Sequence, residues 1–278
     1  MPKRDFYRML LIALLMLVGC TNTEVHPTTP RVEPPMGPIF SIRRPDQVTR
    51  PLDQFILKAD TVVKLGYLYE NLASKCYASK APGSSFKWVG SVEESTQIDI
   101  ENFVIRSTLW GFFDPSAARR LGYHYPAPGP SLEGVKYGPI SEAQVTECIR
   151  SLDEAFPGGR SWEGLIGTGG LPGGGPASPV EDSRYLAAAA KWSACMKIRG
   201  FAAQQPLQLL SDPRWNTPAP TPEEIATATA DVDCKIETNL VGVAVAVLKA
   251  YDNEYIAKHL TELNAFGPMI DKFIRDHQ

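Results

Sequence analysis

TPEEIATATADVDCKI, residues 221–236, decides the class of fold to which this chain belongs. Thr221-Pro222-Glu223-Glu224 combines a capping box with a proline at the first helical position, so a helix begins here. The apolar residues that follow recur at the spacing of one helical face: Ile225, Ala228, Val232 and Ile236. A column along one edge of that face contains Ala226, Ala230 and Cys234. The stretch therefore predicts a helix that carries a cysteine beside its apolar face.

One charged pair in the same stretch is predicted to lie on the surface. Asp231 and Lys235 are four residues apart, which is typical of an exposed ion pair worth a few tenths of a kcal/mol. Asp231 and Asp233 point about 200° apart on a helix, so they cannot act together on one site. We therefore expect no catalytic carboxylate pair in this helix.

Similar signals recur along the rest of the chain. Helix starts are predicted at Pro51, Ser91, Asp114-Pro115, Ser141 and Ser178-Pro179. The first of these helices should extend from about 52 to 80, and an alternative for residues 98–105 is a short strand. Residues 240–248 are rich in β-branched side chains and could form a buried strand. A long terminal helix is favoured over that strand, with a break or kink at Gly267-Pro268. The chain is thus predicted to be all-α, mainly helical with long loops.

The N-terminal residues have the form of a bacterial lipoprotein signal. A basic segment precedes ten unbroken apolar residues, Met9 to Val18, which are too few to span a bilayer. Leu17-Val18-Gly19-Cys20 then matches the lipobox, so residues 1–19 are predicted to be a signal peptide and Cys20 to carry lipid (palmitate where the amino group is also acylated). An ordinary secretory signal and an uncleaved anchor are the alternatives. The predicted location is the extracytoplasmic face of the cell membrane, with the lipidated N-terminus and a proline-rich stalk over residues 20–51.

Charge argues against some partners. The chain has 28 basic and 31 acidic residues, and removing residues 1–19 deletes three basic and one acidic residue. The remaining 25 and 30 give a net charge near −5, with no strongly basic block. Nucleic acid is therefore not an expected partner.

Four cysteines remain besides Cys20, and an even number in an exported chain predicts two disulfides. No CxxC is present, so neither a metal site nor a redox motif is expected. Of the three possible pairings we favour Cys76–Cys148 with Cys195–Cys234, because each bridge then joins successive helical units. The helical domain, 52–278, would have two halves, 52–156 and 177–278. A loop with nine glycines, 157–176, would join them, and it lacks the residues of a nucleotide-binding loop.

The C-terminal half resembles a known family. Trp192-Ser193-Ala194-Cys195-Met196 with Gly200, followed by Ala230-Asp231-Val232-Asp233-Cys234-Lys235, is similar to motifs of uncharacterised secreted and lipid-anchored helical proteins of actinobacteria. In that family W-x-x-C-M-x-x-x-G precedes A-D-V-x-C-K. The resemblance implies an exported helical domain and no particular activity.

The sequence has no catalytic motif that we recognise, neither GxSxG nor HExxH, and no cofactor is expected. Aromatic residues gather between 110 and 137, and we expect them chiefly to pack the core. If they form a stacking platform instead, the candidate ligand-binding residues are Trp110, Tyr123, His124 and Tyr125. The function predicted is a lipid-anchored binding or scaffolding protein for an envelope protein, peptide or cell-wall ligand. The alternative is an envelope hydrolase with a carboxylate-based site between the two halves, which His124 in a pocket beside Asp or Glu would favour.

Overall fold

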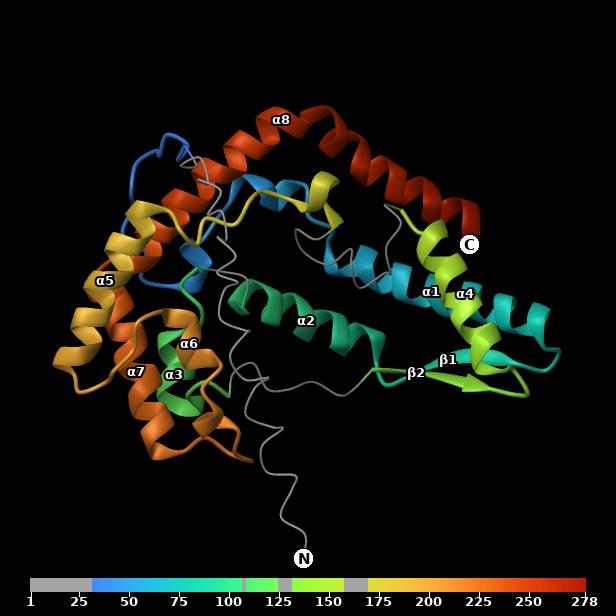
Figure 1. Ribbon diagram of the computed structural model, residues 1–278, viewed down its shortest axis with the longest axis horizontal. Coiled ribbons are helices and arrows are strands. Elements are labelled where there is room, and N and C mark those ends of the chain that lie inside the picture. Colours follow the sequence, from blue (N-terminus) through green and yellow to red (C-terminus); the bar gives the residue numbers. More distant parts are fainter. Residues whose placement is uncertain (1–31, 107–108, 125–131, 158–169) are drawn as a thin grey trace, which may run out of the picture. The chain divides into compact units, whose positions relative to one another are not determined.

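Helices form most of the computed structural model, which describes residues 32–106, 109–124, 132–157 and 170–278 (Figure 1). The all-α prediction is confirmed. The α-helices in these ranges are α1 Ala59–Lys80, α2 Val92–Arg106, α3 Pro115–Leu121, α4 Glu142–Ala155, α5 Ser183–Ile198, α6 Pro206–Leu210, α7 Pro222–Glu237 and α8 Leu240–His277. Short 3₁₀ helices lie at Pro45–Gln47, Pro51–Gln54, Pro172–Gly174 and Pro213–Trp215. Cys20 and Tyr125 lie outside the described residues.

Two strands in the described residues pair as a small antiparallel sheet that packs on α1. Strand β1, Ser85–Val89, pairs with β2, Glu133–Tyr137, in a register that sets Trp88 opposite Gly134. A Cβ atom at Gly134 would lie 2.6 Å from the ring of Phe86, so the absence of a side chain gives this buried ring its space. This sheet links residues 85–89 and 133–137, which the sequence did not predict to pair.

Local capping signals placed several helices correctly. The Asp114 carboxylate accepts the Ser116 N–H at 2.8 Å and caps α3. Ser141 caps α4, and Thr221 caps α7 by accepting the Glu224 N–H at 3.2 Å. Each of these caps satisfies backbone donors that the first helical turn leaves free.

Other predicted boundaries were wrong. Pro51 begins a 3₁₀ helix and α1 begins at Ala59. Helix α5 begins at Ser183, because Asp182 takes the cap position that Ser178 was expected to fill. Residues 98–105 belong to α2, so the strand alternative is wrong.

The terminal helix is confirmed, but its irregular residue is His259 rather than Gly267-Pro268. Pro268 lacks an N–H, which frees the carbonyl of Asn264, and both residues are exposed. Water can therefore satisfy that carbonyl, and the helix continues through the proline.

The two hydrophobic cores do not follow the predicted halves. One core joins residues 109–118 to α5, α7 and the first half of α8. The other joins α1, β1 and α4 to the second half of α8, from Tyr255 to Ile274. The halves 52–156 and 177–278 are therefore interleaved, since each core takes segments from both. Helix α8 contributes to both cores because its 38 residues are long enough to reach them.

The proline-rich segment is not a free stalk up to residue 51. From Pro34 onward it belongs to one compact unit with the rest of the chain. We call residues 34–51 the strap. Arg184 donates to the carbonyl of Pro34 at 2.9 Å, and the Asn239 amide donates to the carbonyl of Phe40 at 3.2 Å. Extended proline-rich backbone leaves its own polar groups unpaired, so side chains of the helices satisfy them instead.

Arg50 fixes the end of the strap to α8. Its guanidinium makes two hydrogen bonds to Asp252, at 2.9 and 2.6 Å, and the Asp252 side chain has 0% exposure. Burial raises the pKa of Asp252, whereas the hydrogen bonds from Arg50 act in the opposite direction. Arg50 is thus the main group that stabilises the charged carboxylate, and a backbone hydrogen bond at Leu52 adds to its effect.

We expect Arg50→Ala to lower the free energy of unfolding by about 2 kcal/mol, because it leaves the Asp252 carboxylate buried without its partner. Arg44→Ala is the matched control in the same strap, since Arg44 pairs with Asp46 on the surface, where such pairs contribute less than about 1 kcal/mol. Urea unfolding measures both changes. Equal losses for the two variants would contradict the role given to Arg50.

Candidate functional site

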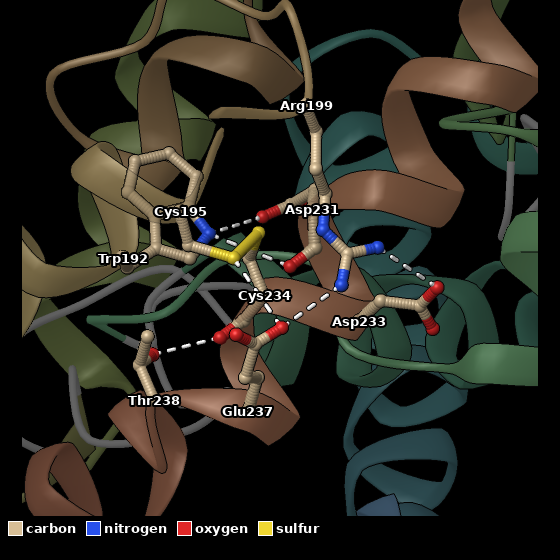
Figure 2. Close-up of a disulfide and its surroundings, with 8 residues drawn as sticks. All are labelled: Trp192, Cys195, Arg199, Asp231, Asp233, Cys234, Glu237 and Thr238. Atoms are coloured by element: carbon tan, nitrogen blue, oxygen red, sulfur yellow. Dashed lines mark hydrogen bonds and ion pairs between the residues drawn. A yellow bond between two sulfur atoms is a disulfide. The ribbon is translucent and has the colours of Figure 1, made fainter. Parts of the chain in front are cut away.

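Both predicted disulfides are present. Cys76 of α1 joins Cys148 of α4 with 5.9 Å between Cα atoms, and Cys195 of α5 joins Cys234 of α7 with 5.7 Å. Figure 2 shows the second bridge with charged residues around it. Arg199 contacts Glu237 at 2.9 Å and Asp233 at 3.4 Å, and all three are at least partly exposed. Trp192 and Asp231 are instead fully buried beside the bridge.

The Asp231–Lys235 pair is buried, which corrects the prediction of a surface pair. Both side chains have 0% exposure. The Lys235 ammonium donates to Asp231 Oδ2 and to the carbonyl of Phe112, each at 2.7 Å. Asp231 Oδ1 accepts the indole N–H of Trp192 at 3.0 Å. The pattern of apolar residues could not predict this, because α3 and α5 pack against the polar edge of α7 as well.

A tyrosine completes the environment of Asp231. The hydroxyl of Tyr123 donates to Asp231 Oδ2 at 3.2 Å, and burial raises the pKa of this phenol. Burial also raises the pKa of Asp231 and lowers the pKa of Lys235. The lysine, indole and phenol donors oppose the effect on Asp231 by stabilising its carboxylate. We call Tyr123, Trp192, Asp231 and Lys235 the buried polar cluster.

His124 lies beside a second buried carboxylate. Its Nδ1 is 2.7 Å from Glu224 Oε1, and its Nε2 is 2.8 Å from the carbonyl of Thr217. Glu224 has 0% side-chain exposure and also accepts the Tyr123 N–H at 2.7 Å. Both ring nitrogens face acceptors, which favours the doubly protonated imidazolium. The carbonyl of Thr217 and then Glu224 raise the pKa of His124.

Gly122 permits this approach of Glu224 to the loop after α3. Its φ of 55° lies in the left-handed region, and a Cβ atom there would be 2.7 Å from Glu224 Oε1. Glycine adopts this conformation at little cost and leaves the space free. The short loop therefore brings Tyr123 and His124 to the start of α7.

The predicted aromatic residues do not form a platform in the described part of the chain. Trp110 is 4% exposed and packs in the core, together with Phe112 and Phe113. Tyr123 and His124 are brought together by Glu224, but through buried contacts. The sequence placed Glu224 only as a capping residue, and it gave no signal that Asp231 and Lys235 would be buried.

The chemistry available to these groups is limited by access. Glu224, Asp231 and Lys235 all have 0% side-chain exposure, so solvent does not reach them in this arrangement. Their hydrogen bonds connect α7 to α5 and to the segment 112–124, which is a structural role. Within the described ranges there is no group of three or more metal-ligating side chains.

Comparison with known proteins adds no assignment. No protein-family model matches the chain, and it has no significant match among curated proteins or solved structures. None of the helices described is long and apolar enough to cross a membrane.

The stability contributed by His124 should depend on pH. Because the folded-state pKa is raised, the contribution is complete below the unfolded value of about 6.5 and is lost as pH rises through the folded pKa. We therefore expect the stability difference between the native chain and His124→Gln to be largest below about pH 6.5 and to shrink at higher pH.

Urea midpoints between acidic and alkaline pH measure this difference. His277→Gln is the control, since that ring contacts Phe273 of α8 and not Glu224. A difference for His124→Gln that grew as pH rose would contradict the imidazolium assignment.

Proposed function

We propose that this protein is a lipoprotein of the cell envelope, anchored through Cys20 on the extracytoplasmic face of the membrane, whose helical domain binds or scaffolds another envelope component. The observation that carries the proposal is Leu17-Val18-Gly19-Cys20 at the end of the ten-residue apolar run Met9 to Val18. That run has the length of a signal-peptide core, and the small residue before Cys20 suits cleavage. Two or more acyl chains make such an anchor stable.

The disulfides support an exported location. Cys76–Cys148 and Cys195–Cys234 use all the remaining cysteines, and disulfides persist in oxidising compartments outside the cytoplasm. The resemblance of the motifs around Cys195 and Cys234 to secreted and lipid-anchored actinobacterial proteins supports the same location. An envelope protein, a peptide or a cell-wall component is the proposed class of partner.

Binding is favoured over hydrolysis by the burial of the polar groups. His124 does lie beside a carboxylate, as a hydrolase would require, but the Glu224 side chain is wholly enclosed. A general base must come within hydrogen-bonding reach of the proton that it removes from the substrate. The carboxylate oxygens of Glu224 and Asp231 instead accept hydrogen bonds within the protein. Their partners are Tyr123, His124, Trp192 and Lys235.

Metabolic labelling tests the anchor. In a bacterium that processes lipoproteins, the native chain should incorporate radioactive palmitate and partition into the membrane fraction. Cys20→Ala should do neither, whereas Cys76→Ala with Cys148→Ala keeps Cys20 and should still be labelled. Absence of label on the native chain, or label that persists in Cys20→Ala, would overturn the proposal.

A further inference from the structure

A cavity of about 440 Å³ lies between the strap and the first half of α8. Small-molecule sites have volumes of roughly 300–1,000 Å³, so this one suits a small ligand. Its apolar lining includes Val245 and Ala246 of α8 together with Pro38 and Phe40 of the strap. The cavity does not involve the buried polar cluster or His124.

The outer wall of the cavity is fixed in place. Asn239, at the start of α8, accepts the Ile42 N–H at 3.3 Å and donates to the carbonyl of Phe40. Gly242 lines the cavity, and a side chain there would collide with that same carbonyl. The close contact at Gly242 holds the strap near α8 at Phe40, and the ion pair with Asp252 holds it there at Arg50, so the site is preformed.

Each of the polar side chains that line the cavity can donate a hydrogen bond. Lys249 is partly exposed and has no carboxylate partner among the described residues, whereas nearby Arg50 is matched by Asp252. Gln47 Oε1 already accepts two backbone N–H groups, at 2.8 and 3.0 Å, which leaves its Nε2 as a donor. The hydroxyls of Ser41 and Thr49 complete this polar side. One unmatched positive charge beside neutral donors favours an anion.

We propose that this cavity binds an amphiphile with one anionic head group, a carboxylate or a phosphate monoester, and a short apolar tail. Lys249 contacts the head group, and Val245, Ala246 and Phe40 surround the tail. This ligand class belongs to the binding domain. It rests on the proposed function only in that the ligand would be encountered in the cell envelope. The site itself requires no lipid on Cys20.

A charge series of short amphiphiles tests the proposal. The protein is the chain from residue 20 to 278 with Cys20→Ser, so that no attached acyl chain competes and failure of lipidation cannot affect the result. Calorimetric titration with octanoate should show saturable one-to-one binding, and octyl phosphate should bind as well. Octanol and octylammonium should bind at least about tenfold more weakly, because they lack the charge that Lys249 recognises.

Variants distinguish this cavity from general surface binding. Lys249→Gln should weaken octanoate binding about tenfold or more with little effect on octanol, and Lys249→Arg should preserve it. Ala246→Leu fills the cavity and should abolish binding of every probe. Lys258→Gln is the matched control, because Lys258 lies on the same helix, pairs with Glu254 and does not line the cavity.

Chemical-shift mapping on the unsubstituted site makes the test independent of variant folding. Octanoate should shift the amide resonances of Ser41, Thr49, Gly242 and Ala246. The proposal is overturned by equal binding of octanol and octanoate, by undiminished binding to folded Lys249→Gln, or by shifts that occur elsewhere. Lack of saturable binding to the native site overturns it as well.

Discussion

Asp231→Ala is expected to lower the free energy of unfolding by about 3–5 kcal/mol, the cost of breaking a buried ion pair by removing one partner. The substitution leaves the Lys235 ammonium enclosed with the carbonyl of Phe112 as its remaining described acceptor. It also leaves the indole N–H of Trp192 and the hydroxyl of Tyr123 without their acceptor carboxylate. Urea unfolding with both disulfides intact measures the loss.

Asp233→Ala is the matched control for this prediction. Asp233 lies two residues along the same helix, and its partners Arg119 and Arg199 are on the surface. Pairs of this kind contribute less than about 1 kcal/mol. Adding Lys235→Met to Asp231→Ala should recover much of the loss, because no charge then remains buried. Similar losses for Asp231→Ala and Asp233→Ala would contradict the stability assigned to the buried ion pair between Asp231 and Lys235.

The features that sequence could predict are local ones. A cap requires a side chain at one position and a free N–H two or three residues later, so Asp114, Ser141 and Thr221 are sufficient to begin their helices. The disulfide pairing followed from the order of the helices along the chain, because each bridge joins helices that the sequence placed on the same side of the glycine-rich loop. Ser178 shows the limit, since Asp182 offers an equally good cap four residues later.

Burial of polar residues depended on contacts that the sequence does not display. Lys235 is enclosed because Phe112, which is 123 residues earlier in the chain, offers its carbonyl. Glu224 is enclosed because the loop that contains Gly122 and Tyr123 packs over the start of α7. A helical pattern identifies the side that is apolar. It cannot show that a neighbouring segment also covers the polar edge and supplies partners there.

The assignment of segments to cores failed for the same reason. Composition suggested that the glycine-rich loop separates two halves, yet α8 packs with both cores. Its residues from Leu240 to Tyr251 contact one core and those from Tyr255 to Ile274 contact the other. Periodicity cannot indicate which of two cores a buried helical face will meet. The strap was missed likewise, because its prolines describe an extended backbone and not what lies beside it.

Replacing both cysteines of either bridge by alanine should cost about 4 kcal/mol, according to the loop-entropy model. The bridges close sequence separations of 72 residues for Cys76–Cys148 and 39 for Cys195–Cys234. Their expected costs therefore differ by only about 0.5 kcal/mol, because the entropy depends on the logarithm of the loop length. Denaturant unfolding of the two double variants measures both losses.

The two double variants should differ in which helices lose protection from amide exchange, even though they lose similar amounts of unfolding free energy. Cys148 is fully buried in the core formed with α1 and α4, and Cys234 in the core formed with α5 and α7. Loss of Cys76–Cys148 should therefore raise amide hydrogen exchange most in α1 and α4, and loss of Cys195–Cys234 most in α5 and α7. The native chain in reductant should show both changes, whereas the same reductant should not further alter the exchange of α5 and α7 in the Cys195–Cys234 variant. The contrary result is that removal of one bridge raises exchange equally in all four helices. That result would mean that the two cores open together as one cooperative unit, although α8 packs its two halves in different cores.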